Sequence, residues 1–210
     1  MAVYHPTLIS CQCGQTFSAN LARSVNAGRT PSIRDRIMRG QFHRVICPNC
    51  GARKAVESPF FYTDLSRHAV YHVRPRNQRY NFRRDSKRLA SAAAAVPADL
   101  ASSDPRQLRV IYGLDELREK LVSQEAGFDD RAVELLKIFV LQEHPFLLQK
   151  PRLLMHLASV DAASVDFVAY YQHGPEEFKV SVPRAASDDI LAREDELRQW
   201  VSTAHKKEGL

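Results

Sequence analysis

The spacing of apolar residues in the first half of the chain predicts short strands and one short helix. Phe42–Ile46 and Ala69–Val73 have the β-branched and aromatic character of strands, and Lys54–Glu57 resembles a shorter strand. A helix is expected between Pro31, which suits the first helical position, and Gly40, which suits the stop. No other helix is predicted before residue 74.

The second half predicts one strand, two helices, a three-stranded antiparallel meander and a final helix. The strand is Leu108–Tyr112, and Gly127 and Pro145 end the two helices that follow. The last helix is expected to begin after Ser187 and to end near Lys206. The meander strands are expected at Leu153–Val160, Val165–Tyr171 and Phe178–Val182.

All four cysteines lie in the first fifty residues, in two close pairs, Cys11-Gln12-Cys13-Gly14 and Cys47-Pro48-Asn49-Cys50-Gly51. A turn that points two thiolates at one ion needs close spacing and a small residue after the second sulfur, and each pair is followed by glycine. Two such turns together make a four-sulfur shell, which structural zinc prefers. We therefore expect one structural Zn²⁺ held by Cys11, Cys13, Cys47 and Cys50.

Other interpretations of the cysteines stay open. Four buried or redox-active thiols are one alternative, because the first pair has one intervening residue instead of two and the gap between the pairs exceeds the usual 15–20 or so residues. A thioredoxin-like site would need a long helix after the second pair, where the sequence favours a strand. Histidines could compete as ligands, although the cysteines already complete a shell; they are His5, His43, His68 and His72.

The second cysteine pair and its surroundings resemble the bacterial CpXC-domain family, named for paired Cys-Pro-x-Cys motifs. The stretches that carry the resemblance are Ser24–Asn26, Arg34–Phe42, Cys47–Gly51, Pro59–Tyr62, Arg109–Lys120, Gly127–Arg131 and Glu134–Lys137. The first pair departs from the family pattern, because Gln12 stands where the family has proline and one more residue. The resemblance implies a zinc-binding domain and supplies no activity.

Together these features predict an α+β protein in three parts. Residues 1–75 are expected to form a zinc-ribbon-like domain with a helical insert. Residues 76–106 read as a basic and Ala-rich helical connector, which ends in a Pro- and Ser-containing joint near residues 97–106. Residues 107–210 are expected to form an α+β domain of helices and the meander.

Charge divides the chain unevenly. Residues 1–110 carry 18 Lys and Arg against 6 Asp and Glu, a balance of +12, whereas residues 111–210 carry 12 against 18, a balance of −6. The two balances give the net charge of +6. This division indicates two regions that attract each other or that bind different partners.

The positive charge is densest between Arg74 and Arg88, where aromatic residues are interleaved with arginines. Arginine forks match phosphate oxygens and aromatic rings stack on unpaired bases, so the segment is a candidate nucleic-acid-binding site. Its candidate residues are Arg74, Arg76, Arg79, Tyr80, Phe82, Arg83, Arg84, Lys87 and Arg88. We favour the alternative that this segment docks on the acidic second region, because a basic run alone is weak evidence for nucleic-acid binding.

Catalysis finds little support in the sequence. The phosphate-binding, dinucleotide-binding, zinc-protease and serine-hydrolase motifs are all absent. The acidic pairs Asp129-Asp130 and Asp188-Asp189 suit helix N-termini, and His144, His156 and His173 lack an identifiable nucleophile.

The chain has no run of about 18 apolar residues, and its beginning does not read as a secretory signal, so we expect a cytoplasmic protein. The sequence thus predicts a non-catalytic, zinc-stabilised interaction module with a protein partner. The alternatives are a nucleic-acid-binding protein that uses the basic segment and an enzyme of unrecognised type.

Overall fold

The chain forms two units, residues 1–117 and residues 118–210. The computed structural model describes residues 2–67, 69–94, 108–128, 130–149, 152–171, 176–197 and 199–201. Both units combine helices with β-sheets, so the α+β class is confirmed. Among the described residues, no helix is both long enough and apolar enough to cross a bilayer.

The first unit contains a large sheet and a small one. Its strands are β1 (Val3–Ser10), β2 (Thr16–Asn26), β3 (Arg44–Ile46), β4 (Arg53–Ala55), β5 (Phe60–Asp64), β6 (Ala69–Arg74) and β7 (Leu108–Tyr112). Its helices are α1 (Pro31–Met38), η1 (Leu65–Arg67), η2 (Arg76–Asn81), α2 (Phe82–Ala94) and the first residues of α3 (Leu114–Ala126). The large sheet has the order β1-β2-β5-β6-β7, and β3 pairs only with β4.

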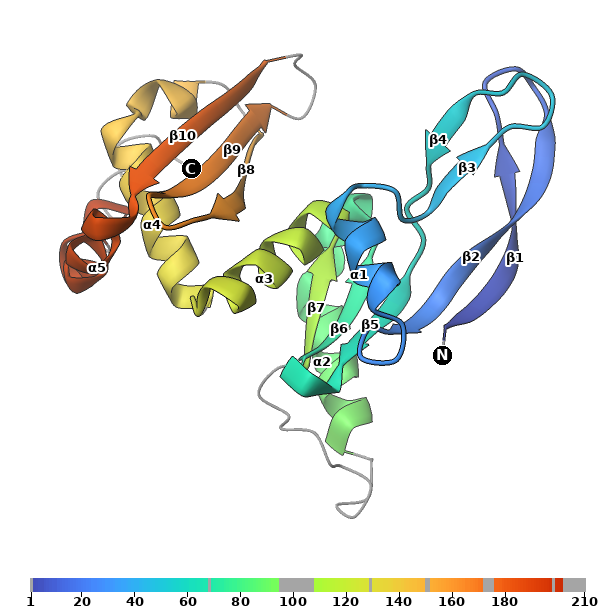
Figure 1. Ribbon diagram of the computed structural model, residues 1–210, viewed down its shortest axis with the longest axis horizontal. Coiled ribbons are helices and arrows are strands. Elements are labelled where there is room, and N and C mark those ends of the chain that lie inside the picture. Colours follow the sequence, from blue (N-terminus) through green and yellow to red (C-terminus); the bar gives the residue numbers. More distant parts are fainter. Residues whose placement is uncertain are drawn as a thin grey trace. The chain divides into compact units, whose positions relative to one another are not determined.

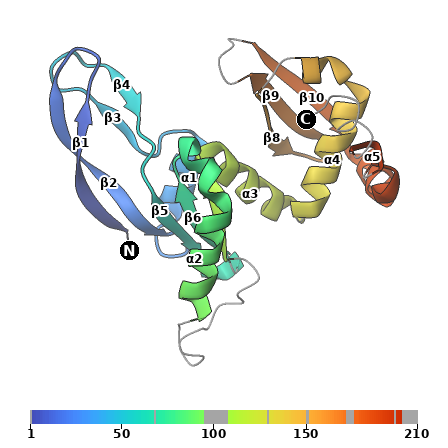
Figure 2. The same ribbon diagram turned by 180° about the vertical axis from the view of Figure 1, so that it is seen from behind.

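Helices lie on both faces of the large sheet. Helix α1 lies on the face that Figure 1 shows in front, and α2 lies on the opposite face, seen in Figure 2. Strand pairs β1–β2 and β5–β6 are antiparallel, whereas β2–β5 and β6–β7 are parallel. Helix α1 buries Ile33 and Ile37, while β5 and β6 bury alternate residues, Tyr62 and Tyr71 among them, as expected for strands with one fully covered face.

The β1–β2 hairpin and the β3–β4 pair together form a projection from the large sheet, which we call the finger (Figure 1). A small apolar core of Ile9, Leu21 and Val45 holds the two layers of the finger together. Phe17, Ala19 and Val56 pack around that core. So few apolar side chains make a marginal core, and an additional constraint on the finger is therefore valuable.

The sequence located some elements of this unit and missed others. Helix α1, β3, β4 and β6 lie at their expected places, whereas β1, β2 and β5 were not predicted. Strand β7, expected to open the second region, instead pairs with β6 as the last strand of the large sheet. The expected joint at residues 97–106 lies outside the described residues.

The second unit packs helices with a three-stranded sheet. Its elements beyond α3 are α4 (Asp130–Glu143), η4 (Pro145–Gln149), β8 (Leu153–Val160), β9 (Ser164–Tyr171), β10 (Glu177–Pro183) and α5 (Arg184–Ala192), and residues 194–197 and 199–201 are helical. The order β10-β9-β8 with antiparallel pairing confirms the predicted meander. Contacts join α5 to α4, β9 and β10.

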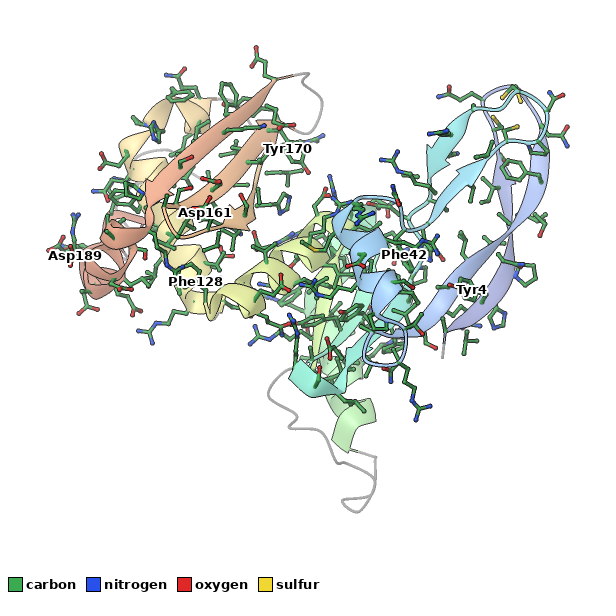
Figure 3. All side chains as sticks on the ribbon, viewed as in Figure 1. Tyr4, Phe42, Phe128, Asp161, Tyr170 and Asp189 are labelled. Atoms are coloured by element: carbon green, nitrogen blue, oxygen red, sulfur yellow. The ribbon has the colours of Figure 1, made fainter. Side chains whose placement is uncertain are left out.

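The last helix differs from its prediction. Helix α5 begins at Arg184, directly after Pro183 of β10, and not after Ser187. Ser187 is buried and its hydroxyl donates to Arg184 O at 2.7 Å, a bond within the helix and not an N-cap. Asp188 and Asp189 are exposed residues within the helix; Figure 3 labels Asp189. The expected helix end near Lys206 lies outside the described residues.

Candidate metal centre

The four cysteines meet at the end of the finger. The β1–β2 turn carries Cys11 and Cys13, and the β3–β4 turn carries Cys47 and Cys50. Their sulfur atoms all lie within 4.8 Å of one another, and Figure 3 shows them in yellow at the end of the finger. The structure thus brings together every residue of the predicted metal site.

The distances between sulfurs fit a metal shell and not disulfides. Cys11 Sγ lies 3.7 Å from Cys50 Sγ, and Cys13 Sγ lies 3.7 Å from Cys47 Sγ. A disulfide needs about 2.05 Å, and all four cysteines are free. A tetrahedral ion with metal–sulfur bonds of about 2.3 Å separates its sulfurs by about 3.8 Å.

Both turns have the same hydrogen-bond design despite their different lengths. The Cys11 N–H donates to Gln15 O at 2.8 Å, and Cys11 O accepts from Gly14 N–H at 3.0 Å. In the second turn, the Cys47 N–H donates to Ala52 O at 2.9 Å, and Cys47 O accepts from the N–H of the glycine after the second cysteine at 2.9 Å. Each bond of the second turn spans one more residue, so the shorter Cys-Gln-Cys motif makes a tighter version of the same turn.

The glycine after each pair is required by the backbone. Gly14 has φ +87° and Gly51 has φ +69°, a left-handed conformation that other residues rarely adopt. No atom lies within 4 Å of a Cβ built at either position, so the requirement comes from the backbone dihedral and not from crowding. The sequence argument for these two glycines is therefore correct.

Backbone and side-chain N–H groups surround the sulfurs and favour thiolates. The Gln15 N–H and the Asn49 amide lower the pKa of Cys13 to about 6. The Cys50 N–H lowers the pKa of Cys47. At Cys50 the Ala52 N–H acts in the same direction, but the neighbouring thiols raise its pKa to about 11. Clustered thiolates repel one another, and a cation among them removes that repulsion.

Two contacts of long side chains cross between the turns. Asn49 Nδ2, in the second turn, lies 3.7 Å from Cys13 Sγ in the first. Lys54 Nζ donates to Ser10 O at 2.9 Å and so ties β4 to the end of β1. These contacts align the two cysteine pairs independently of an ion.

The histidines considered as competing ligands lie elsewhere. His43 is buried, stacks on Phe42 at 4.2 Å, and its Nε2 accepts the Ala22 N–H at 3.0 Å. His72 stacks on an aromatic ring of β5, and His5 is exposed on β1. His68 lies outside the described residues. Among the described residues, the four cysteines are the one group of side chains that could hold a metal ion.

Comparison with family models matches residues 9–137 to the CpXC protein family, which is more than half of the chain. This chain belongs to the CpXC family. The match covers both cysteine pairs of this CpXC protein, together with α2 and the first part of α4. No curated protein and no solved structure matches the chain.

The basic segment of this CpXC protein divides into two halves. The first three arginines meet acidic side chains of the same unit: Arg74 with Asp85 at 3.7 Å, Arg76 with Asp115, and Arg79 with Glu116 at 3.4 Å. Asp115 and Glu116 follow residue 110, in the acidic part of the sequence, so these two pairs agree with docking. They lie at the start of α3, within the first unit.

The second half of the segment faces solvent. Tyr80 is 84% exposed, Phe82 is 53% exposed, and the Arg84 side chain is 56% exposed. Arg83, Lys87 and Arg88 are also exposed on α2. The nine residues predicted from the sequence therefore have two kinds of surroundings, ion pairs for the first three arginines and solvent for the other six.

Sequence reasoning missed a buried charge cluster in the second unit. The Glu119 carboxylate, with its side chain 3% exposed, lies 2.8 Å from Lys137 Nζ and accepts the Leu157 N–H at 2.9 Å. Lys120 and His156 lie within 4.0 Å of it. In the sequence of α3, Glu119 is the middle one of three charged residues between Leu117 and Leu121, so nothing in the sequence marks it as buried.

The remaining acid and histidine candidates that the structure describes have separate neighbours. Asp130 binds Lys120 Nζ at 2.8 Å, and His144 contacts the ring of Phe146 at 6.0 Å between centroids. Asp129 and His173 lie outside the described residues.

Proposed function

We propose that this protein is a non-catalytic interaction module whose finger is stabilised by one structural zinc ion and binds a protein partner. The observation that carries the proposal is the cluster of four free thiols with 3.7 Å sulfur separations. Zinc accepts a four-sulfur tetrahedral shell and needs no further ligand. Such a shell leaves no coordination position for water or substrate, and we therefore assign the zinc a structural role and not a catalytic one.

Zinc would hold together two layers that share little apolar surface. Neighbouring strand residues point to opposite faces, so Ile9 and Val45 fill the finger core while Leu8 and Ile46 point outward. Leu8 is 77% exposed and Ile46 is 61% exposed. A rigid finger that presents apolar side chains on its outer surfaces is suited to contact with another protein.

The proposal places the protein in a reducing compartment such as the cytoplasm. Exposed thiols persist where disulfides are reduced, and two of the four cysteines, Cys13 and Cys50, are exposed. Bound zinc keeps such thiols deprotonated and out of disulfides.

Elemental analysis of protein purified without a metal-affinity tag tests the metal. We expect one zinc per chain for the native protein and for Ser18→Ala, a control at an exposed position of the same finger. Cys47→Ser and Cys50→Ser should lose the metal, and hydrogen exchange in β3 and β4 should rise towards the unfolded rate. Absence of zinc together with four freely titrating thiols would overturn the metal assignment.

Variants of the outward residues test the partner. Leu8→Ser and Ile46→Ser should keep the zinc but weaken a stoichiometric, salt-tolerant protein complex, because they remove only exposed apolar surface. The cysteine variants should lose the same complex. A complex that survives all four changes would show that the finger is not the contact surface.

A further inference from the structure

We propose a second binding surface, for single-stranded nucleic acid, on the face of the large sheet beside α2. Phe61 would stack on a base, and the exposed cations of α2 would hold the phosphates. This surface lies in the same unit as the finger, and it uses neither the four cysteines nor the outward residues Leu8 and Ile46.

The strand register defines the surface. Direct cross-strand partners point to the same face of a sheet, and one such row crosses all five strands. The row consists of Val3, Ser24, Phe61, His72 and Val110. Val110, at one end, is buried, whereas Val3 at the other end is 48% exposed.

Phe61 stands in the middle of this row and is partly exposed to solvent. Its ring stacks on His72 with 4.4 Å between centroids and 10° between planes, yet Phe61 remains 41% exposed. Its neighbour on the other side is Ser24, whose small side chain cannot cover the ring. Burial, and then Arg74, lower the pKa of His72, so this ring is uncharged at neutral pH and the pair is an apolar platform. Aromatic rings so placed stack on bases of any sequence.

Helix α2 borders the platform on the same face. Asp85 of α2 accepts the Tyr112 hydroxyl at 3.0 Å and pairs with Arg74, which follows His72 by two residues and so shares its face. Figure 2 shows α2 in front of β6, with β5 beside it. The Phe82 ring lies 6.5 Å from the Tyr112 ring. Neighbouring strands are about 4.8 Å apart, so β7, which contacts α2, lies about 10 Å from β5, which carries Phe61. One or two nucleotides bridge that distance.

The exposed charge of α2 is suited to a polyanion. The one acidic residue of the helix, Asp85, is 3% exposed and is already bound to Tyr112 and Arg74. Among the described residues, no acidic side chain forms an ion pair with Arg83, Lys87 or Arg88. Cations beside an uncovered aromatic ring favour a single strand, because a duplex keeps its bases stacked on one another.

Fluorescence anisotropy of the full chain with labelled dT20 tests this surface. We expect binding that weakens as salt rises. Phe61→Leu should weaken it roughly tenfold and leave the salt slope unchanged, because a stacking contact is lost and no charge is removed. Arg83→Gln with Lys87→Gln should lower the slope of log K against log salt by about 1.4, which corresponds to two phosphate contacts on a single strand.

Matched controls separate this surface from general effects. Phe146→Leu changes a phenylalanine of the second unit with 43% exposure, and Arg29→Gln with Arg39→Gln removes two exposed charges near α1. Both controls should leave dT20 binding unchanged. Phe146→Leu is the control for Phe61→Leu, and the Arg29 and Arg39 variant is the control for the Arg83 and Lys87 variant. A control that weakens dT20 binding as much as the variant it is matched to overturns the proposal.

Three probes distinguish the occupants. Absence of dT20 binding at 50 mM salt, or equal affinity for a dT20–dA20 duplex, refutes a single-strand site. Polyglutamate bound as tightly as dT20 means that the cations contact an acidic protein instead. Each of these results leaves the zinc content and the finger complex unaffected, so failure here is distinct from failure of the proposed function.

Discussion

Replacing Glu119 by Gln should destabilise the second unit strongly, although it exchanges one oxygen for nitrogen on a single side chain. The carboxylate is almost completely buried and lies 2.8 Å from Lys137 Nζ, whose own side chain is 13% exposed. Removing one partner of a buried ion pair costs about 3–5 kcal/mol, because the other charge is left buried. Lys137 keeps Glu134 at 3.0 Å, so we expect a value near the lower end, about 3 kcal/mol.

Glu134 supplies the matched control. It binds the same Lys137 Nζ, but its side chain is 60% exposed. Exposed pairs contribute about 0–1 kcal/mol, so Glu134→Gln should cost less than 1 kcal/mol. The two variants share the charge removed, the partner Lys137 and the substitution, so their difference reports the burial of Glu119 together with its contacts to Leu157, Lys120 and His156.

Urea unfolding followed by tryptophan fluorescence measures this effect. The chain has one tryptophan, Trp200, in the second unit, so the signal reports that unit. With a denaturant slope of about 1.5 kcal/mol per molar, 3 kcal/mol lowers the midpoint by about 2 M. Equal midpoints for the Glu119 and Glu134 variants would refute the reasoning from burial.

The pH dependence gives a second measure of the same cluster. Burial alone would lower the pKa of Lys137, but Glu119 and Glu134 raise it above its ordinary value of 10.5. A group with a raised folded pKa contributes its full stability below the unfolded pKa and loses it as pH rises through the folded pKa. The native unit should therefore lose stability above about pH 10.5, and Glu119→Gln should reduce this loss.

Two further predictions concern the first unit. Gly51→Ala should cost about 1–2 kcal/mol and weaken metal binding, because φ is +69° there, whereas Gly28→Ala should have a smaller effect; chelator competition and thermal unfolding measure both. Burial lowers the pKa of His43 to about 4, so the unit should lose stability as pH falls from about 6.5 to 4. His43→Asn, which tolerates the φ of 53° at this position, should flatten that dependence in denaturation curves recorded by circular dichroism.

The sequence predicted elements that have local signals. Pro31 and Gly40 bracket α1, and the alternation in Ala69–Val73 identified β6. The cysteine cluster was equally predictable, because two cysteines followed by glycine are a local pattern. The β1–β2 hairpin was missed because its exposed residues, Leu8 among them, break the alternation that marks a half-buried strand.

Features that depend on distant partners could not be predicted. Strand β7 was assigned to the wrong region, because its pairing with β6 joins residues on either side of a long connection. Its three consecutive buried residues, Val110–Tyr112, are typical of a strand covered on both faces, which a local pattern does not distinguish from other apolar runs. Burial of Glu119 likewise depends on Lys137 and Leu157, both far away in the sequence.

The opposite charges of the two sequence halves do not by themselves account for the basic segment. The pairs of Arg76 with Asp115 and Arg79 with Glu116 use two of its cations, and both are partly exposed pairs that contribute about 0–1 kcal/mol each. Four further cations on α2 are exposed, and among the acidic residues that the structure describes, one lies within 4 Å of them: Asp85, at 3.7 Å from Arg84. Folding gains little from such a concentration of like charges, which repel one another along one helix face. The proposed single-strand site gives these four cations a role that docking within the chain does not, and the dT20 measurements described above decide between the two.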